Sequence, residues 1–524
     1  MIASSLLALA RRFPVSPWPL AALTMVVMIL AAVGVLPRWP GLIHMVALPP
    51  MAEFTDLRIL VTRAPSYPIF IIGLVLSVAV RITVLALLLG GLDRARISLA
   101  IRFYLVALPL GLLAATFLYA AGATLFYALF WVGLLGVVVF FIALAALPWM
   151  RDAGFLPKSL ISVKSGLRAG TVVAYLGLLI ILGGVADLAG PVGTVLLVPV
   201  SAALTFVAAN ALVANPGLRV PRRIVATGTL AAFVALAAVL LTGASESPDA
   251  SPTAETRPDS LLIMSGVDSS SGQGVIFSTN PHLLGFTCEQ TYYYSYAGPG
   301  DGVPQESGFC PIRTGAPYFP GDTLRPSDEL VEFLLQQAAE LPEPVVVAGH
   351  SQAAWIMWKA LAENDPHGIS ALVLVGTFPA NPVGYPPDLD HGPGRVGAEV
   401  AYLLSNLPRP GGTTAFDPAA PLAREFLADA GAIERLMSRP LPADVRVLSI
   451  TSVSDLPLMP DGWRVDEAED ACPMALIHPH IPWAEEYHTA IDRFLDGEPM
   501  PRCAAWKTAI GVLTRPFAVP PYDA

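Results

Sequence analysis

Long apolar stretches fill the first half of this 524-residue chain and constrain its fold more than any other feature. About 20 apolar residues in a helix can cross the roughly 30 Å hydrocarbon core of a bilayer. Seven such stretches lie near residues 18–36, 69–91, 102–122, 124–148, 169–189, 193–214 and 223–243. The first has no small-x-small cleavage site after it, so we expect an anchor that is kept and not a signal peptide. The sequence therefore predicts an α-helical transmembrane bundle of seven spans over residues 1–243.

The two halves of the chain carry opposite charge. Residues 1–243 hold 16 Lys or Arg and 5 Asp or Glu, whereas residues 244–524 hold 15 and 36. A basic, apolar half followed by an acidic, mixed half predicts a membrane domain joined to a soluble one. The acidic half would repel the phosphates of nucleic acid, so we expect no nucleic-acid partner.

The positive charges also predict the orientation in the membrane. If the N-terminus is cytoplasmic, the cytoplasmic segments hold twelve Lys or Arg, and the opposite loops hold only Arg38, Arg58 and Arg63. Such an excess on one side is typical of cytoplasmic loops. Seven spans then place everything after residue 243 outside the cytoplasm, in a multi-pass protein of the cell membrane.

All four cysteines lie in the half that this topology exports. An even set confined to one exported domain indicates disulfide bonds. We favour Cys288 with Cys310 and Cys472 with Cys503, although four cysteines allow three connectivities. A zinc site is disfavoured because the sequence has no C-x-x-C pair, and we expect neither a metal nor another cofactor.

The soluble half alternates apolar strands with helical patterns. Residues 244–258 are polar and proline-rich, which predicts a flexible linker before a domain over 259–524. The alternation predicts an α/β fold with a mostly parallel sheet and helices on both faces. The expected strands are 261–265, 290–296, 344–348, 371–376 and, as the last, 445–453. A proline-rich stretch at 380–443 is either a cap over the site or a structural insertion.

Ser351 lies between one of these strands and a predicted helix, in the sequence Gly-His-Ser-Gln-Ala. A serine hydroxyl is a poor nucleophile, and esterases present it on a strained strand-to-helix turn beside a histidine. The segment resembles the nucleophile elbow of the α/β-hydrolase superfamily, in the form found in lipases and cutinase-like esterases. It departs from the commonest pattern at Ala353, where glycine is usual, and a chance match is the competing interpretation.

The resemblance implies a catalytic acid and then a histidine after the nucleophile in chain order. Asp455 directly follows an apolar strand and is the favoured acid, with Asp461 as its rival. His478 is favoured over His480 as the base, because in similar lipases the histidine precedes the last helix by several residues.

Two backbone N–H groups should hold the oxyanion. The resemblance assigns them to Gln352, after the nucleophile, and to Val267 or its neighbour Asp268, after the first strand.

These features predict a membrane-anchored serine esterase or lipase that forms an acyl-enzyme with a lipid or ester substrate, which the membrane could carry. Two alternatives remain open. One is a cell-envelope acyltransferase with the same triad, and the other is a non-catalytic sensor or transporter with a degenerate hydrolase domain. Arg81, in the second stretch, is either a site for an anion or lipid head group or a structural arginine. The sequence makes no prediction of oligomeric state.

Overall fold

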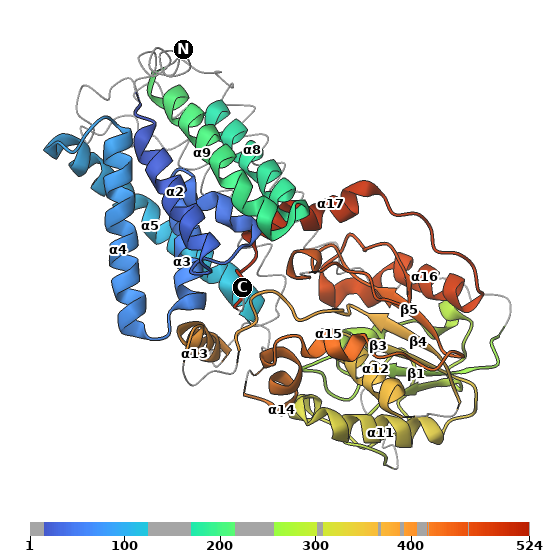
Figure 1. The fold of residues 1–524 in the computed structure, drawn as a ribbon. Helices are drawn as coiled ribbons and strands as arrows, with labels where there is room; N and C mark the ends of the chain where they lie inside the picture. The colour runs from blue at the N-terminus through green and yellow to red at the C-terminus, as the bar shows by residue number, and fades with distance from the viewer. Residues whose placement is uncertain are drawn as a thin grey trace.

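The structure is a computed structural model that describes residues 15–123, 169–214, 256–300, 308–364, 368–387, 392–405, 417, 419–459 and 461–522. Figure 1 shows two parts that lie side by side, a helical bundle from the first part of the chain and an α/β domain from the last part. The predicted linker at 244–258 lies outside the described residues, apart from its last three positions.

Six α-helices form the described helical bundle. They are α2 (Trp18–Ala32), α3 (Met51–Arg63), α4 (Tyr67–Leu88), α5 (Arg94–Ala123), α8 (Ala169–Leu188) and α9 (Gly190–Ala214). A 3-10 helix, η1 (Pro40–Val46), packs against α3, α8 and α9. Two of these helices are long and apolar enough to cross a membrane, namely α4 and the Gly190–Ala211 part of α9.

The expected count of seven spans is not reached among the described residues. The stretches at 69–91 and 193–214 form the two long apolar helices. Those at 18–36, 102–122 and 169–189 contain shorter apolar helical segments within the described residues, namely Trp18–Ala32, Gly111–Ala120 and Ala174–Leu188. The helix in the first of these stretches, Trp18–Ala32, ends at a turn where Gly34 adopts φ +80°. The stretches at 124–148 and 223–243 lie outside the described residues.

Helix α3 occupies the region that was expected to be an external loop, and many of its polar side chains are buried in the bundle. One of them, Asp56, accepts hydrogen bonds from Arg81 Nε at 2.8 Å and Arg81 Nη2 at 2.6 Å. Ser77 Oγ also donates to this carboxylate, at 2.5 Å. Both ends of the ion pair are buried, so Arg81 has the structural role that the sequence left as one of two interpretations.

The α/β domain contains a six-stranded sheet in which every pair is parallel. The strands are β1 (Ser260–Met264), β2 (Thr291–Tyr293), β3 (Val345–His350), β4 (Ile369–Val375), β5 (Arg446–Ile450) and β6 (Glu469–Asp470), in the order β2-β1-β3-β4-β5-β6. The predicted α/β fold with a parallel sheet is confirmed. The prediction that β5 is the last strand is wrong, since β6 follows it in the sheet. The sequence did not indicate β6 because this strand consists of two acidic residues with no apolar run.

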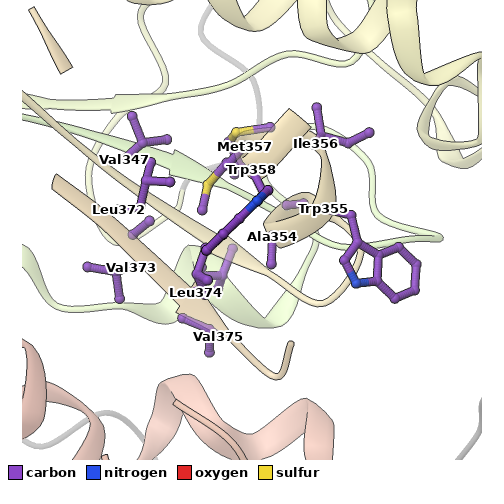
Figure 2. Packing of buried hydrophobic residues seen from close by; sticks show 14 of the residues in the cluster. Val347, Ala354, Trp355, Ile356, Met357, Trp358, Leu372, Val373, Leu374 and Val375 are labelled. Carbon is purple, nitrogen blue, oxygen red and sulfur yellow. The ribbon is translucent and has the colours of Figure 1, made fainter. Parts of the chain in front are cut away.

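Helices cover both faces of the sheet. Figure 1 shows α11 (Ser327–Ala339), α12 (Ala353–Glu363) and α15 (Ala432–Met437) on one face and α16 (Glu485–Leu495) on the other. Figure 2 shows how the first turns of α12 bury their apolar side chains against β3 and β4. Residues 353–358 are all buried, so the start of α12 is held rigidly on the sheet.

The insertion at 380–443 contacts both parts of the molecule. Its helix α13 (Arg395–Ser405) packs against α3 and α5 of the bundle, whereas α15 packs against α12. Further along the insertion, the helical chain is divided into α14 (Pro421–Ala423), a π-helical turn at Arg424–Ala428 and α15. The break comes at Gly431, whose φ of +71° no helix allows.

Two disulfide bonds join Cys288 to Cys310 and Cys472 to Cys503, with Cα–Cα distances of 5.4 and 5.1 Å. The favoured pairing is therefore confirmed. Each bond closes a short loop of the α/β domain and lies away from the elbow serine in sequence.

The chain after Cys503 returns to the bundle, which the sequence did not predict. It forms α17 (Ala505–Thr514) and the 3-10 helix η10 (Arg515–Phe517). Both elements pack against α8. Figure 1 shows α17 at the junction between the two parts.

Candidate active site

Ser351 occupies a sharp turn between β3 and α12. Its φ is +59°, a left-handed conformation that is rare for residues other than glycine and costs about 1–3 kcal/mol. Its N–H donates a 2.6 Å hydrogen bond to the carbonyl of Val375 at the end of β4. The strained backbone is thus anchored on the sheet, and it lifts the serine clear of both flanking elements, leaving it half-buried.

Small residues make this turn possible. A methyl group on Gly349 would lie 2.5 Å from Met357 Sδ and 3.0 Å from Cβ of Ala353. The methyl group of Ala353 is itself fully buried. Alanine therefore fits where the common pattern has glycine, because the residue that it faces has no side chain.

Asp455 and His478 lie in direct contact. His478 Nδ1 is 2.8 Å from Asp455 Oδ2, and the aspartate side chain is fully buried. Ser454 Oγ donates to Asp455 Oδ1 at 3.1 Å and accepts the N–H of His478 at 3.0 Å. With its Nδ1 proton directed at the carboxylate, a neutral imidazole presents Nε2 as the proton acceptor.

The His478 ring is held beside the elbow. Its centroid is 4.9 Å from that of His350, the residue before Ser351, and His350 Nε2 lies 3.3 Å from the His478 carbonyl. Gly376, at the end of β4, faces the same ring, since a methyl group there would lie 2.6 Å from its Cε1. The structure therefore brings the predicted acid, base and nucleophile to one edge of the sheet.

The rival residues lie elsewhere. Asp461 is exposed. His480 stacks on Trp483 with ring centroids 4.5 Å apart, and partial burial lowers its pKa. Neither makes the carboxylate–imidazole contact that Asp455 and His478 share.

The loop after β1 supplies the second side of the site. A methyl group on Gly266 would lie 3.0 Å from Cβ of Ser351, so this loop touches the elbow. The Asp268 N–H donates to Thr323 Oγ1 at 3.1 Å. Over the described part of the chain, the N–H groups of Val267 and Gln352 make no hydrogen bond. Those two groups are therefore available to an oxyanion, and this geometry favours Val267 over Asp268.

His350 is a neutral support for the elbow. Burial, and then the nearby His478, lower the pKa of its imidazole to about 3. Its ring therefore stays uncharged near neutral pH and can donate from Nε2 to the His478 carbonyl. A charged ring here would repel a positive charge on the neighbouring His478 ring.

The strand order explains why these loops meet. In the sheet, β1 lies between β2 and β3. The chain passes from β1 to β2 in one direction along the sheet and then returns past β1 to form β3. At such a switch point the chain leaves the two neighbouring strands in opposite directions, and ligands bind in the crevice between the loops outside their carboxyl ends. The Gly266–Asp268 loop and the elbow are those two loops.

Three supporting residues were not identified from the sequence. Ser454 is adjacent to the predicted acid, and a buried hydroxyl beside a carboxylate could have been suspected. Gly376 ends a predicted strand, and its φ of +68° requires glycine. Thr323 lies in the 3-10 helix η6 (Pro320–Leu324), where nothing local indicates that it contacts the loop after β1 or that its carbonyl accepts the Gln352 side chain at 2.7 Å.

No group of three or more His, Cys, Asp or Glu side chains in the described residues is arranged to hold a metal ion. Comparison with protein-family models and with curated protein sequences found no match to this chain. Its function is therefore inferred from the residues and geometry of this site.

Proposed function

We propose that this protein is a membrane-anchored serine hydrolase of the α/β-hydrolase type that cleaves carboxylic esters with Ser351, His478 and Asp455. One observation carries the proposal. The 2.8 Å contact between His478 Nδ1 and the buried Asp455 lies beside a strained turn that presents a serine. Nucleophile, oriented base and buried acid are the three parts that activate a hydroxyl.

The chemistry is acyl transfer to water. Nε2 of His478 takes the hydroxyl proton as Ser351 Oγ bonds to the ester carbonyl carbon, and the carbonyl oxygen becomes an oxyanion facing the N–H groups of Gln352 and Val267. The imidazolium then gives its proton to the departing alcohol, which leaves an acyl-serine. Water, deprotonated by the same imidazole, attacks the acyl carbon, releases the carboxylic acid and restores the serine.

The bundle is proposed to cross the membrane seven times, with a cytoplasmic N-terminus and an extracytoplasmic hydrolase domain. Two long apolar helices, the charge asymmetry and the two disulfide bonds support this arrangement.

The substrate is proposed to be an ester carried by the membrane. The loop at the carboxyl end of β5 contacts the α17–η10 segment, which packs on α8. A methyl group on Gly384, after β4, would lie 2.3 Å from Cβ of Val519. The edge of the sheet that holds the candidate site is therefore turned towards the bundle.

Labelling with a fluorophosphonate probe tests the activity, because the probe reacts covalently only with an activated serine. We expect the full chain in membranes to label and the Ser351→Ala variant not to label. Ser351→Gly is a second negative control whose residue suits the left-handed backbone. Failure of the folded wild-type protein to label, or equal labelling of either variant, would refute the proposal.

Protease treatment of intact cells tests the topology separately. We expect external protease to cut within residues 244–258 and to give, on a denaturing gel, a shorter fragment that retains the probe. Complete protection of that segment, in cells where a known external protein is cut, would show that the domain is not exported.

A further inference from the structure

The last part of the α/β domain joins the candidate site to the bundle. We call residues 505–522 the strap, since they follow Cys503 at the end of the domain and reach α5 of the bundle. Strap residues 516–520 are all buried. Figure 1 shows α17 of the strap bridging the two parts of the molecule.

Arg58 of α3 holds the strap on the bundle side. Its Nη1 donates to the carbonyls of Phe517 and Ala518, both at 2.5 Å, and Nη2 donates to the carbonyl of Pro516 at 3.2 Å. The side chain is buried, with 1% of its surface exposed. A buried guanidinium is costly unless its N–H groups find acceptors, and here three successive strap carbonyls accept from its two terminal nitrogens.

Close packing adds to this polar contact. Helix α8 has two glycines that face the strap. A methyl group on Gly183 would lie 2.5 Å from Pro516 Cγ, and one on Gly184 would lie 3.0 Å from Leu513. At the end of the strap, Tyr522 and Tyr119 of α5 share a 2.9 Å hydroxyl hydrogen bond. The strap therefore fits a surface on the bundle that is shaped to receive it.

On its other side, the strap covers the loop that carries the acid. Asp455 is followed by the 3-10 helix η8 (Leu456–Leu458), which packs against α17 and η10. A methyl group on Gly511 would lie 2.7 Å from Cβ of Leu456, the residue after the acid. Arg515 Nη2 donates to the carbonyl of Met459. One short segment thus touches the bundle with one face and the acid loop with the other.

We propose that the bundle positions Asp455 through the strap, with Arg58 and Gly511 as positioning residues for the hydrolase site. The proposal rests on the proposed serine hydrolase function. Arg58 fixes the path of residues 516–518, α17 follows that path, and the absence of a side chain at Gly511 lets loop 455–459 pack closely beneath it. The carboxylate is then held where it orients His478, and a change in the bundle at Arg58 alters the reactivity of Ser351 without touching the site.

Substitution of Gly511 gives the sharpest test. Alanine is the better helix former, so helix propensity alone makes Gly511→Ala at least as stable as the wild type. Its methyl group, however, must displace Leu456 and with it the acid. We expect the rate of fluorophosphonate labelling to fall by about tenfold or more. Ala509→Gly on the exposed face of the same helix is the matched control, with the opposite propensity change and an unaltered rate.

The path of the effect is tested by a double-mutant cycle. If Gly511 acts through the acid, Gly511→Ala should cause no further fall in the labelling rate of the Asp455→Asn variant. Because that variant labels slowly, its labelling is followed over hours. Arg58→Lys keeps the charge but cannot bridge three carbonyls, and it should show the same dependence on Asp455. Since lysine could impair folding of the bundle, the Gly511 variant stands as the primary measurement.

The outcomes separate the two proposals. Labelling of folded Gly511→Ala at the wild-type rate overturns the positioning role and leaves the hydrolase function intact. An equal loss in both backgrounds also overturns it, because the effect then bypasses the acid. Absence of labelling in the folded wild-type protein refutes the hydrolase function, and with it the site that the strap would serve.

Discussion

Gly376 offers a direct test of whether the position of the His478 ring controls the reactivity of Ser351. This glycine ends β4 with φ +68°. A methyl group at position 376 would lie 2.6 Å from Cε1, 3.0 Å from Nδ1 and 3.3 Å from Nε2 of the imidazole. The perturbation is the substitution Gly376→Ala.

The expected loss follows from two separate costs. Ordinary contact begins near 3.4 Å, so the ring must move by about 0.8 Å. A misplacement of about 1 Å can cost roughly 100-fold in rate, which corresponds to about 2.7 kcal/mol of transition-state stabilisation. Independently, a left-handed alanine costs about 1–2 kcal/mol of stability.

Gly497 provides a matched control for the backbone cost. Its φ is +71°, and a methyl group there would meet no atom within 4 Å. Gly497→Ala should therefore lose the same 1–2 kcal/mol of stability and keep its reactivity. The two rates of fluorophosphonate labelling are compared under conditions in which thermal unfolding shows both variants to be folded.

Similar labelling rates for the two alanine variants would contradict this reasoning. It would mean either that the imidazole takes no part in activating the serine or that the ring has room to move without loss. Hydrolysis of a soluble nitrophenyl ester provides a second measurement, because a displaced base lowers kcat more than it changes KM.

Further variants probe the acid, a disulfide bond and the buried histidine. Asp455→Asn should slow labelling by about 10⁴-fold, because the amide favours the wrong tautomer of His478. Replacing Cys472 and Cys503 by serine should lower the free energy of unfolding by about 3–4 kcal/mol, as judged from denaturant titrations, because the bond closes a loop of 31 residues. Burial lowers the pKa of His350 to about 3, so between pH 6.5 and 3 the unfolded chain binds a proton that the folded protein does not. Stability should therefore fall on acidification, by up to about 1.4 kcal/mol per pH unit from this residue, and His350→Gln should show a smaller slope in unfolding measured against pH.

The parallel sheet could be predicted because its central strands are continuous apolar runs. β1, β3 and β4 are buried on both faces, and such strands stand out in a sequence. β6 could not be predicted, since its two acidic residues join the sheet only because β5 offers an unpaired edge. Tertiary structure created that strand, and local sequence contains no signal for it.

The candidate site was predicted to the extent that it follows strand ends. Ser351 directly follows β3, and Asp455 directly follows the apolar run that contains β5, so the sequence predicts both at one edge of the sheet. The choice between His478 and His480 depends on how the chain turns through η9 (His478–Trp483), a 3-10 helix that the local pattern does not define. Arg58 was predicted to lie in an external loop, whereas it is buried in the bundle. This could not be predicted, because its partners are backbone carbonyls more than 450 residues away, and backbone groups give no signal in the composition.

The strap also follows every strand of the sheet in the order of synthesis. A ribosome that has completed β6 and the His478 segment has made all the proposed catalytic groups but not yet the segment that docks them on the bundle. A prematurely terminated polypeptide would thus carry a complete set of reactive groups with a poorly oriented acid. If the positioning role holds, Ser351 of a nascent chain stays unreactive until the final residues have packed against the bundle.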